Sequence, residues 1–330
     1  MTLRFGSDVE PGIHRTGTSR HRYVDARTGR APSDADMARI AALAVPPAWT
    51  DVWIAADPSS HVQATGRDAK GRKQYRYHAE FTSDRAMDKF AGLLPFAAGL
   101  GRLRRRVERD LRGPDLTYDR VVATLVKLLD VTSLRVGNDE YARANRSFGL
   151  TTLRNGHAVV RGSAVRLAFP GKSAHRFDLT IENKRLARVV RRCQHLPGQR
   201  LFEYEDLDGS IRAVGSQDVN AYLSEHGTSG TTAKTFRTWN ATVLTADGLA
   251  RIAPDQPAPT KRTVNDVVDE VAGELGNTRA VCRASYVHPA VVEAYLEGDL
   301  APRWSRPVSG RPAGLTVAER KTARLLRQRS

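Results

Sequence analysis

The chain has 330 residues, 40% of them apolar, which is enough for roughly two compact domains and too many for a wholly disordered protein. No apolar run approaches the ~18 residues that a membrane span needs, and the first residues lack the apolar stretch of a signal peptide. The 52 basic and 36 acidic residues leave a net charge of +16, which favours a polyanionic partner, nucleic acid first and an anionic membrane surface second. The two cysteines, Cys193 and Cys282, have no zinc-ligand spacing and are too few for a disulfide framework, so we expect a reducing, cytoplasmic location.

The first 92 residues show short β patterns separated by turns. Alternating or β-rich runs cover residues 51–56, 61–68 and 73–81. Turn signals such as Asp57-Pro58 separate these runs, and a helical pattern begins after Ser83. We therefore predict a β-rich N-terminal domain over residues 1–92, in which 14 basic and 11 acidic residues give a net charge of +3.

The remaining residues carry the other +13 of net charge and are expected to be mainly helical. One helix face is predicted by the spacing of Val121, Val122, Leu125, Leu128 and Leu129. Further helical patterns cover residues 184–196, 216–225, 231–250, 261–275 and 289–297. Gly99 and Gly101 predict a break between two helices near the start of this region.

Three β-like runs interrupt these helices, at residues 157–162, 164–169 and 176–181. Turns centred on Gly162 and Gly171 join them. The last segment, residues 303–329, holds eight basic residues and one Glu and is expected to form a frayed or DNA-facing helix. The predicted fold class is therefore α+β, with a small β-rich domain (1–92) followed by a larger, mainly α-helical domain (93–330) that contains a three-stranded β insertion and ends in the basic tail.

Common metal and phosphate-loop motifs do not occur in this sequence. The nine histidines form no His-X-His or His-Glu-X-X-His pair. Gly171-Lys172-Ser173 resembles the end of a phosphate-binding loop but lacks the glycine that begins one. We therefore expect no metal and no nucleotide or other small-molecule cofactor.

Five polar residues remain as candidates for chemistry: Arg135, Lys172, Arg237, Asn277 and Tyr286. Each has an ordinary structural explanation when taken alone. Arginines are abundant in this chain and usually lie on the surface, and Lys172 lies in a turn. Asn277 follows a predicted helix, and a tyrosine such as Tyr286 is often a half-buried core residue.

Three sequence blocks give these residues a common context: Gly71-Arg72-Lys73-Gln74-Tyr75-Arg76-Tyr77-His78, TAKTFRTWNAT (232–242) and LGNTRAVCRASYVHP (275–289). Through them, and from Pro46 to about Leu296, the chain resembles the type IB DNA topoisomerases, in particular the bacterial and poxvirus branch. The resemblance implies a catalytic set of Arg135, Lys172, Arg237, Asn277 and the nucleophile Tyr286. Many members carry His at the position of Asn277, and this chain resembles bacterial members that have Asn. Tyr141 matches a family position that contacts a backbone phosphate.

The implied chemistry is physically consistent with these residue types. In phosphoryl transfer, negative charge spreads over the nonbridging phosphate oxygens, which suits two arginines and a further donor such as Asn277. The phenol of a tyrosine has a pKa of about 10 and becomes a nucleophile when a positive field favours its phenolate. Lys172, on a hairpin turn, can protonate the leaving 5′ oxygen.

A second group of candidates lies on the strand expected near residues 73–81. Gln and Tyr side chains can read base edges, and Lys and Arg bind phosphates. The pattern alone fits equally well a basic exposed strand whose aromatic residues pack inward. The resemblance favours DNA contact, which it places on Lys70, Arg72, Lys73, Gln74, Tyr75 and Tyr77.

The favoured hypothesis is a monomeric two-domain clamp around duplex DNA, acting at the nucleoid. It would relax supercoils of both signs through a 3′-phosphotyrosyl bond, without ATP or metal. A tyrosine recombinase shares this chemistry, but its usual His-X-X-Arg-His pattern is here replaced by Lys234 and Thr238 around Arg237. A non-enzymatic basic DNA-binding protein is the third hypothesis, and it predicts no covalent protein–DNA adduct.

Overall fold

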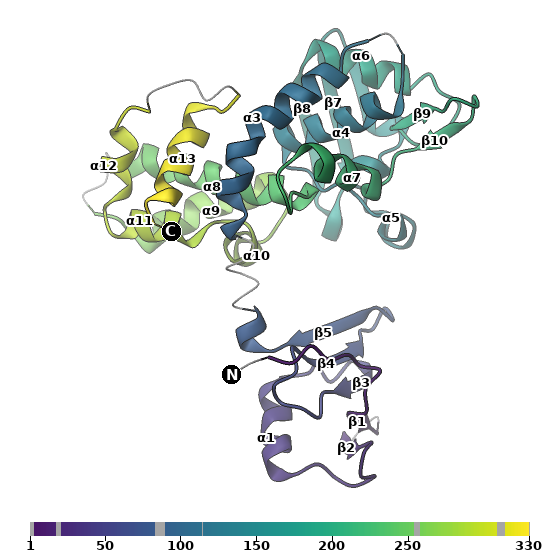
Figure 1. The fold of residues 1–330 in the computed structure, drawn as a ribbon, viewed down its shortest axis with the longest axis vertical. Helices are drawn as coiled ribbons and strands as arrows, with labels where there is room; N and C mark the ends of the chain where they lie inside the picture. Colours follow the sequence, from purple (N-terminus) through teal and green to yellow (C-terminus); the bar gives the residue numbers. More distant parts are fainter. Residues whose placement is uncertain are drawn as a thin grey trace. The chain divides into compact units, whose positions relative to one another are not determined.

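The fold is α+β, as predicted, in a computed structural model that describes residues 3–17, 21–82, 90–113, 115–253, 258–308 and 314–329. The chain divides into two compact units, Met1–Lys89 and Phe90–Ser330 (Figure 1). A β-sheet dominates the first unit, and the second is mostly helical with a small three-stranded sheet. The helical pattern expected just after Ser83 lies outside the described residues.

The first unit is built on a five-stranded antiparallel sheet with the strand order β2-β1-β3-β4-β5. Its strands are β1 (Ile13–Thr16), β2 (Arg22–Asp25), β3 (Thr50–Ile54), β4 (Val62–Arg67) and β5 (Lys73–Tyr77). Helix α1 (Asp34–Ala42) begins at Ser33, whose side chain accepts a hydrogen bond from the Asp36 amide. Ile40 of this helix joins Ile13 and Ile54 of the sheet in a small core. The sequence predicted β3, β4 and β5, but not β1, β2 or α1.

The three-stranded sheet of the second unit has the order β6-β7-β8, with β6 (Ala158–Arg161), β7 (Ala164–Pro170) and β8 (Arg176–Glu182). These strands match the predicted β insertion. The β7–β8 pairing runs from Ala164 opposite Glu182 to Pro170 opposite Arg176. The turn that contains Lys172 therefore lies at the opposite end of β7 from the turn at Gly162, about 23 Å away at the usual rise per strand residue.

Helices build most of the main core of the second unit, and the sheet adds to it the buried residues of alternating positions on β7. These helices are α3 (Leu93–Asp110), α4 (Tyr118–Thr132), α5 (Asp139–Asn145), α6 (Lys184–Cys193), α7 (Ser216–His226), α8 (Ala233–Ile252), α9 (Lys261–Leu275), α10 (Arg279–Ser285), α11 (Pro289–Leu296), α12 (Leu300–Ser305) and α13 (Val317–Arg327). A short hairpin, β9 (Glu203–Glu205) with β10 (Ile211–Ala213), projects from the sheet side. The sheet with α4, α6 and α7 lies on one side, and α9 and α11–α13 lie on the other (Figure 1). Within the described residues, no helix is both long and apolar enough to cross a membrane.

The predicted helix break at Gly99 and Gly101 is wrong, because α3 continues through both residues. Gly99 and Gly101 instead allow close packing of other segments against α3. A Cβ atom at Gly99 would lie 2.4 Å from Cγ2 of Thr228, and one at Gly314 would lie 2.9 Å from the Cα of Gly101. A side chain at Gly99 or Gly314 would collide with the neighbouring segment, so the absence of side chains lets Thr228 and Gly314 approach α3 closely.

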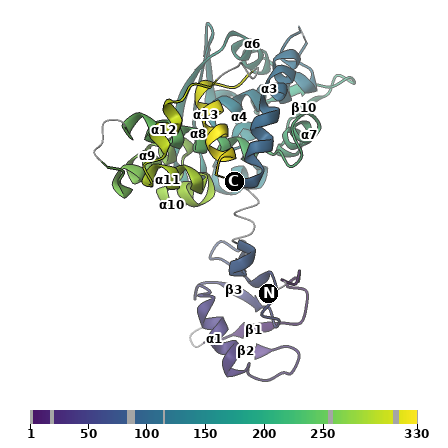
Figure 2. The same ribbon diagram turned by 60° about the vertical axis from the view of Figure 1, so that its left-hand side comes forward.

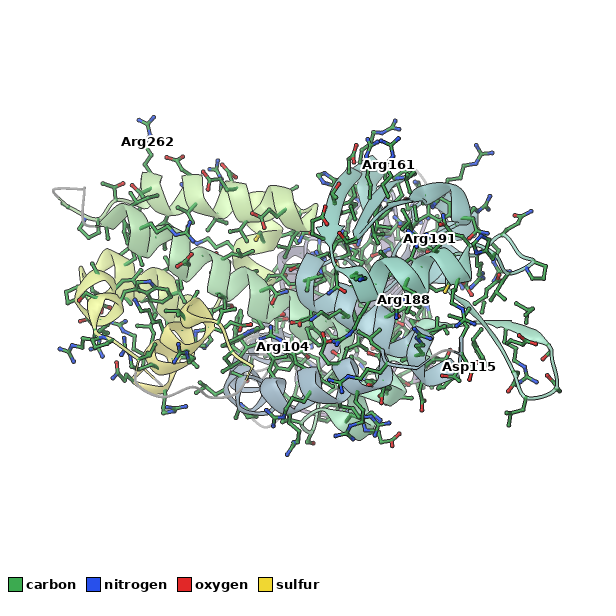
Figure 3. The ribbon with its side chains drawn as sticks, turned by 90° about the horizontal axis from the view of Figure 1, so that it is seen from above. Arg104, Asp115, Arg161, Arg188, Arg191 and Arg262 are labelled. Carbon is green, nitrogen blue, oxygen red and sulfur yellow. The ribbon has the colours of Figure 1, made fainter. Side chains whose placement is uncertain are left out.

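Within the basic C-terminal segment, α13 (Val317–Arg327) is a packed helix. Of the two alternatives expected for this segment, the frayed helix is therefore wrong, and the DNA-facing helix stays a prediction. Thr316 caps α13 by accepting a hydrogen bond from the Glu319 amide, and Leu325 and Leu326 are buried. Helix α13 lies beside α3 in two views (Figure 1 and Figure 2). Arg104 of α3 lies where these helices meet (Figure 3) and pairs with the buried carboxylate of Glu319.

Candidate active site

Two of the predicted arginines converge on the C-terminal end of α9. Arg237 Nη2, from α8, donates to the Leu275 carbonyl oxygen at 2.9 Å, and Arg135 Nη1 donates to the same oxygen at 3.4 Å. The last carbonyl groups of a helix have no partner within the helix and carry the negative end of its dipole, so they suit guanidinium donors. Arg237 also donates to the Ser133 carbonyl oxygen, at the left-handed residue that ends α4.

Neither of these arginines has a carboxylate partner among the described residues. Arg237 is 3% exposed, and its Nε atom is buried without a hydrogen-bond partner in the described part of the chain. Burial, together with the charge of Arg237, lowers the pKa of Arg135 to about 10, and burial also lowers the pKa of Arg237. Both groups remain cationic at neutral pH, so the site holds two positive charges that no carboxylate of the described residues pairs with.

Tyr286 lies next to these charges. The guanidinium carbon of Arg237 lies 5.0 Å from the centre of its ring. The Tyr286 amide ends α10 by donating to the Cys282 carbonyl oxygen at 2.9 Å. Thr242 of α8 donates to the Tyr286 carbonyl oxygen at 3.1 Å, and its hydroxyl accepts from the His288 amide at 3.2 Å. Tyr286 is therefore fixed from α8 and α10 together, and its ring is partly buried.

Asn277 completes the arginine pair from the turn between α9 and α10. Gly276 ends α9 with φ +62°, a left-handed conformation that favours glycine, and its carbonyl oxygen accepts from Arg135 at 3.2 Å. The side-chain oxygen of Asn277 accepts from the same guanidinium at 2.5 Å. Its Nδ2 is buried without an acceptor among the described residues. The bond through Oδ1 thus leaves a donor available for a ligand.

The turn with Lys172 docks on the same glycine. A Cβ atom at Gly276 would lie 2.6 Å from Cζ of Phe177, and one at Gly171 would lie 2.5 Å from Cε2 of the same ring. Phe177 is therefore held between two glycines, one on the Lys172 hairpin and one beside Asn277. Lys172 itself is exposed, and its side chain has no hydrogen bond or ion pair within the described residues. The structure thus brings the hairpin that carries Lys172 into contact with Gly276, the residue before Asn277.

Apart from Tyr141, the predicted DNA-binding residues lie on β5 and the turn before it, and the side chains of three of these six already pair with carboxylates. Arg72 forms an ion pair with Asp68 at 2.6 Å, and Gln74 donates to the same carboxylate at 3.0 Å. The hydrogen bond from Arg72 outweighs desolvation and holds the pKa of Asp68 at about 2. Lys73 forms an ion pair with Asp8 at 2.6 Å.

The two tyrosines of β5 are exposed, which is contrary to the inward packing that one alternative expected, and DNA contact by this strand stays a prediction. Tyr75 is 44% and Tyr77 45% exposed. Their rings stack 5.8 Å apart with an interplanar angle of 6°. Lys70 is exposed in the preceding turn. Tyr141 lies in α5, and its side chain lies outside the described part of the structure.

Comparison with known proteins identifies the family. Residues 78–299 match the profile described as "Eukaryotic DNA topoisomerase I, catalytic core", and residues 20–68 match "Bacterial DNA topoisomerase IB, N-terminal domain". The chain is 34% identical over 268 residues to DNA topoisomerase 1B of Acanthamoeba polyphaga mimivirus, across 79% of this chain and 80% of the viral protein. The chain belongs to the type IB DNA topoisomerases. It is an isomerase of that family, and its substrate is DNA.

Eukaryotic type IB topoisomerases share a smaller part of their length with this chain. DNA topoisomerase 1 of Mycosarcoma maydis is 26% identical over 254 residues, which cover 68% of this chain and 25% of the fungal protein. DNA topoisomerase 1 beta of Arabidopsis thaliana is 27% identical over 197 residues, which cover 59% of this chain and 20% of the plant protein. The chain thus spans a quarter or less of these two relatives.

Several residues that shape this type IB site were not singled out in the sequence. Thr242 holds the Tyr286 backbone, and Gly276 admits Phe177 next to Asn277. The place of Gly276 after an amphipathic helix was a signal for a C-terminal turn, but its contact with the β hairpin depends on the tertiary fold. Asp68 and Asp8, which pair with the basic residues of β5, were also missed. Among the described residues, no cluster of His, Cys, Asp or Glu could hold a metal ion.

Proposed function

We propose that this protein relaxes supercoiled DNA of either sign by cleaving one strand transiently and resealing it. The observation that carries the proposal is the buried Arg237 beside the ring of Tyr286, with the half-buried Arg135 on the same carbonyl oxygen of Leu275. Neither arginine has a carboxylate partner in the described part of the chain. A buried cation without a counterion is unfavourable unless a ligand brings the anion. A DNA phosphate is such an anion, and it would lie within reach of a phenolic nucleophile.

In the proposed reaction, Tyr286 Oη attacks the scissile phosphorus, and the bond from phosphorus to the 5′ oxygen breaks. A 3′-phosphotyrosyl bond and a free 5′ hydroxyl result. Arg135, Arg237 and the free Nδ2 of Asn277 stabilise the charge that develops on the nonbridging oxygens. The free strand rotates about the intact one, and the 5′ hydroxyl then attacks the phosphotyrosine to reseal the strand. The covalent bond conserves the energy of the phosphodiester, so no ATP is needed.

Lys172 is proposed as the general acid for the leaving 5′ oxygen. The phenolic proton of Tyr286 goes to solvent, and the 5′ oxygen takes a proton from the Lys172 ammonium group. The exposure of Lys172 and the position of its turn beside Asn277 support this role. During resealing the same amine takes the proton back from the 5′ hydroxyl.

The first unit is proposed to bind the duplex through β5, as one half of a monomeric clamp. Tyr75, Tyr77 and Gln74 would contact base edges in the major groove, and Lys70, Arg72 and Lys73 would contact phosphates. Since Arg72 and Lys73 already pair with Asp68 and Asp8, DNA phosphates must compete with those carboxylates for the cations. Tyr141 is proposed as a further phosphate contact. The clamp would act on the nucleoid.

A plasmid-relaxation assay in EDTA without nucleotide, stopped with denaturant, tests this function. Relaxation and a covalent protein–DNA adduct are expected, because the cations of the site are side chains. Tyr286→Phe keeps the ring and its contact with Arg237 but removes the attacking oxygen, so it should bind duplex DNA and form no adduct. An absolute need for Mg²⁺ or ATP, or an adduct formed by Tyr286→Phe, would contradict the proposal. Duplex binding by the unaltered protein without any adduct would indicate a non-enzymatic DNA-binding protein.

A further inference from the structure

His175 lies at the contact between the Lys172 turn and the arginine site. A Cβ atom at Gly276 would lie 2.8 Å from Cδ2 and 3.3 Å from Cγ of the His175 imidazole. The carbonyl oxygen of Gly276 accepts a hydrogen bond from Arg135, and the next residue is Asn277. The imidazole therefore packs directly on the backbone that carries Asn277 and accepts the hydrogen bond from Arg135.

The backbone of His175 also closes the turn that carries Lys172. The Gly171 amide donates to the His175 carbonyl oxygen at 2.7 Å, and the His175 amide donates to the Lys172 carbonyl oxygen at 3.4 Å. The imidazole lies edge-on to the Phe177 ring, with the ring centres 4.7 Å apart and an interplanar angle of 71°. Two rings from one hairpin thus cover a glycine that has no side chain to separate them from the helix end.

Lys172 depends on this contact for its position. Its side chain has four rotatable bonds and makes no hydrogen bond or ion pair within the described residues, so nothing on the side chain itself holds it at the site. The direction from which it approaches is set by the turn. Proton transfer requires the donor within hydrogen-bond distance of the leaving oxygen, so a small displacement of the turn would remove most of its effect.

We propose that His175 is a positioning residue whose ring seats the Lys172 turn on Gly276 and Asn277, so that Lys172 reaches the leaving 5′ oxygen. The inference rests on the general-acid role proposed above for Lys172. It assigns packing, and not proton transfer, to the imidazole. His175→Phe should therefore keep the cleavage rate, because a phenyl ring preserves the contact with Gly276. His175→Ala removes this contact and should lower the rate.

Single-turnover cleavage of two duplex substrates tests this inference with the full chain. One substrate has an ordinary scissile phosphate, and in the other a sulfur atom replaces the bridging 5′ oxygen, so that the leaving thiolate needs no proton. His175→Ala should cleave the ordinary substrate about 10²-fold more slowly than the unaltered protein and recover on the sulfur substrate. His175→Phe should cleave both at nearly the unaltered rate. His195→Ala, which removes an exposed imidazole after α6, is the matched control and should change neither rate.

Gly276→Ala provides a second variant that does not alter the histidine. The added Cβ would meet both rings and would be strained at φ +62°, so the variant should lose at least as much rate as His175→Ala on the ordinary substrate. Because the Gly276 carbonyl oxygen also holds Arg135, the sulfur substrate should restore only the part of the loss that comes from the Lys172 turn. The unfolding temperature of this variant and its affinity for uncleaved duplex are measured beside the rates. Ala and Phe variants of His175 that are equally slow would overturn the inference, because they would show that the imidazole itself is needed.

Other outcomes also decide the matter. If His175→Ala cleaves the ordinary substrate at the unaltered rate, or remains slow on the sulfur substrate, His175 does not act through the proton donor. Lys172→Ala, measured on the same substrates, separates this failure from that of the proposed function. If the sulfur substrate does not rescue Lys172→Ala, the general-acid role of Lys172 is wrong. If it rescues Lys172→Ala but not His175→Ala, only the role of His175 is wrong.

Discussion

Two arginine side chains lie where folding by itself would not favour them. Arg237 is almost fully buried and Arg135 half-buried, and their partners are the carbonyl oxygens of Leu275, Gly276 and Ser133 with one amide oxygen. Neutral acceptors fix the direction of the guanidinium groups without cancelling their charge. The site therefore keeps its electrostatic potential for an incoming phosphate, and the donors need little reorientation when charge develops on it.

Arg237→Lys is expected to separate this charge from its geometry. A lysine keeps the positive charge but loses the planar fork that spans Ser133 and Leu275, so it cannot donate to both carbonyl groups and a phosphate. We expect single-turnover cleavage to fall by about 10²–10³-fold while affinity for uncleaved duplex changes little. Arg262→Ala, at an exposed arginine of α9 (Figure 3), is the matched control and should leave the cleavage rate constant unchanged. A cleavage rate for Arg237→Lys near that of the unaltered protein would rule out the proposed role of the planar fork.

Helix α13 is joined to the site through a buried ion cluster. Arg104 of α3 pairs with Asp130 of α4 and with Glu319 of α13, each at 2.7 Å. Trp239 of α8, two residues from Arg237, donates to Glu319 at 3.2 Å. Asn240 donates to the Asp130 carbonyl oxygen and to the hydroxyl of Ser133. The C-terminal helix is therefore linked to the parts of α4 and α8 that lie next to Arg135 and Arg237, so we expect its removal to disturb the proposed site as well as the packing of α13.

Glu319→Gln should lower the free energy of unfolding by about 1.5–3 kcal/mol at pH 7, the usual value of a hydrogen bond to a charged group. Burial raises the pKa of Glu319, but its hydrogen bonds and ion pair with Arg104 outweigh burial and leave the pKa below its usual range. The stabilising contribution is therefore present above the unfolded value of about 4.3 and is lost as pH falls through the folded value. The difference in the free energy of unfolding between the unaltered protein and Glu319→Gln should therefore become smaller at acidic pH.

Chemical denaturation of both proteins between pH 7 and pH 3 measures that difference. Glu293→Gln, at an exposed position of α11, is the control and should change stability by less than about 0.5 kcal/mol. A difference that stays constant down to pH 3 would show that the charge of Glu319 does not contribute.

The parts of the fold that local sequence patterns determine were predictable. The apolar period of α4 and the β runs of the Lys172 hairpin are examples, because one face or alternate residues must be buried in any such element. The breaks at Gly99 and Gly101 were wrongly predicted, because the residue that needs the space, Thr228, is distant in the sequence. A frayed tail was one of two alternatives expected, and it is wrong because the partner of Glu319 is Arg104, 215 positions earlier. The five proposed site residues were identified through a resemblance carried by linear motifs, whereas the glycine contacts around Asn277 and the Lys172 hairpin required the tertiary structure.

The distribution of charge differs between the two units. Residues 1–92 have a net charge of +3, and the other 238 residues carry +13. On β5, carboxylates pair with Arg72 and Lys73, and in the C-terminal segment Arg329 pairs with Glu297. Carboxylates of the protein thus already pair with many of its basic side chains. The net charge therefore overstates the number of basic side chains that can bind DNA phosphates without first breaking an ion pair. Arg135 and Arg237 differ from them in lacking a carboxylate among the described residues.

The affinity of the protein for duplex DNA should therefore fall steeply with ionic strength. Some basic side chains of the protein must also break an ion pair with a carboxylate before they can bind a phosphate. Tyr286→Phe allows binding to be measured without cleavage. If six to ten phosphates are contacted, the association constant should fall by about 10³–10⁵-fold between 50 and 200 mM salt.

Asp68→Asn removes the carboxylate that holds Arg72 and Gln74, so in the Tyr286→Phe protein it should tighten binding at every salt concentration. Asp247→Asn, which removes the partly buried partner of the exposed Arg251 on α8, provides a comparison for the general effect of one less negative charge. Tighter binding by Asp68→Asn than by Asp247→Asn would place β5 on the DNA, and equal binding by the two variants would remove it from the interface.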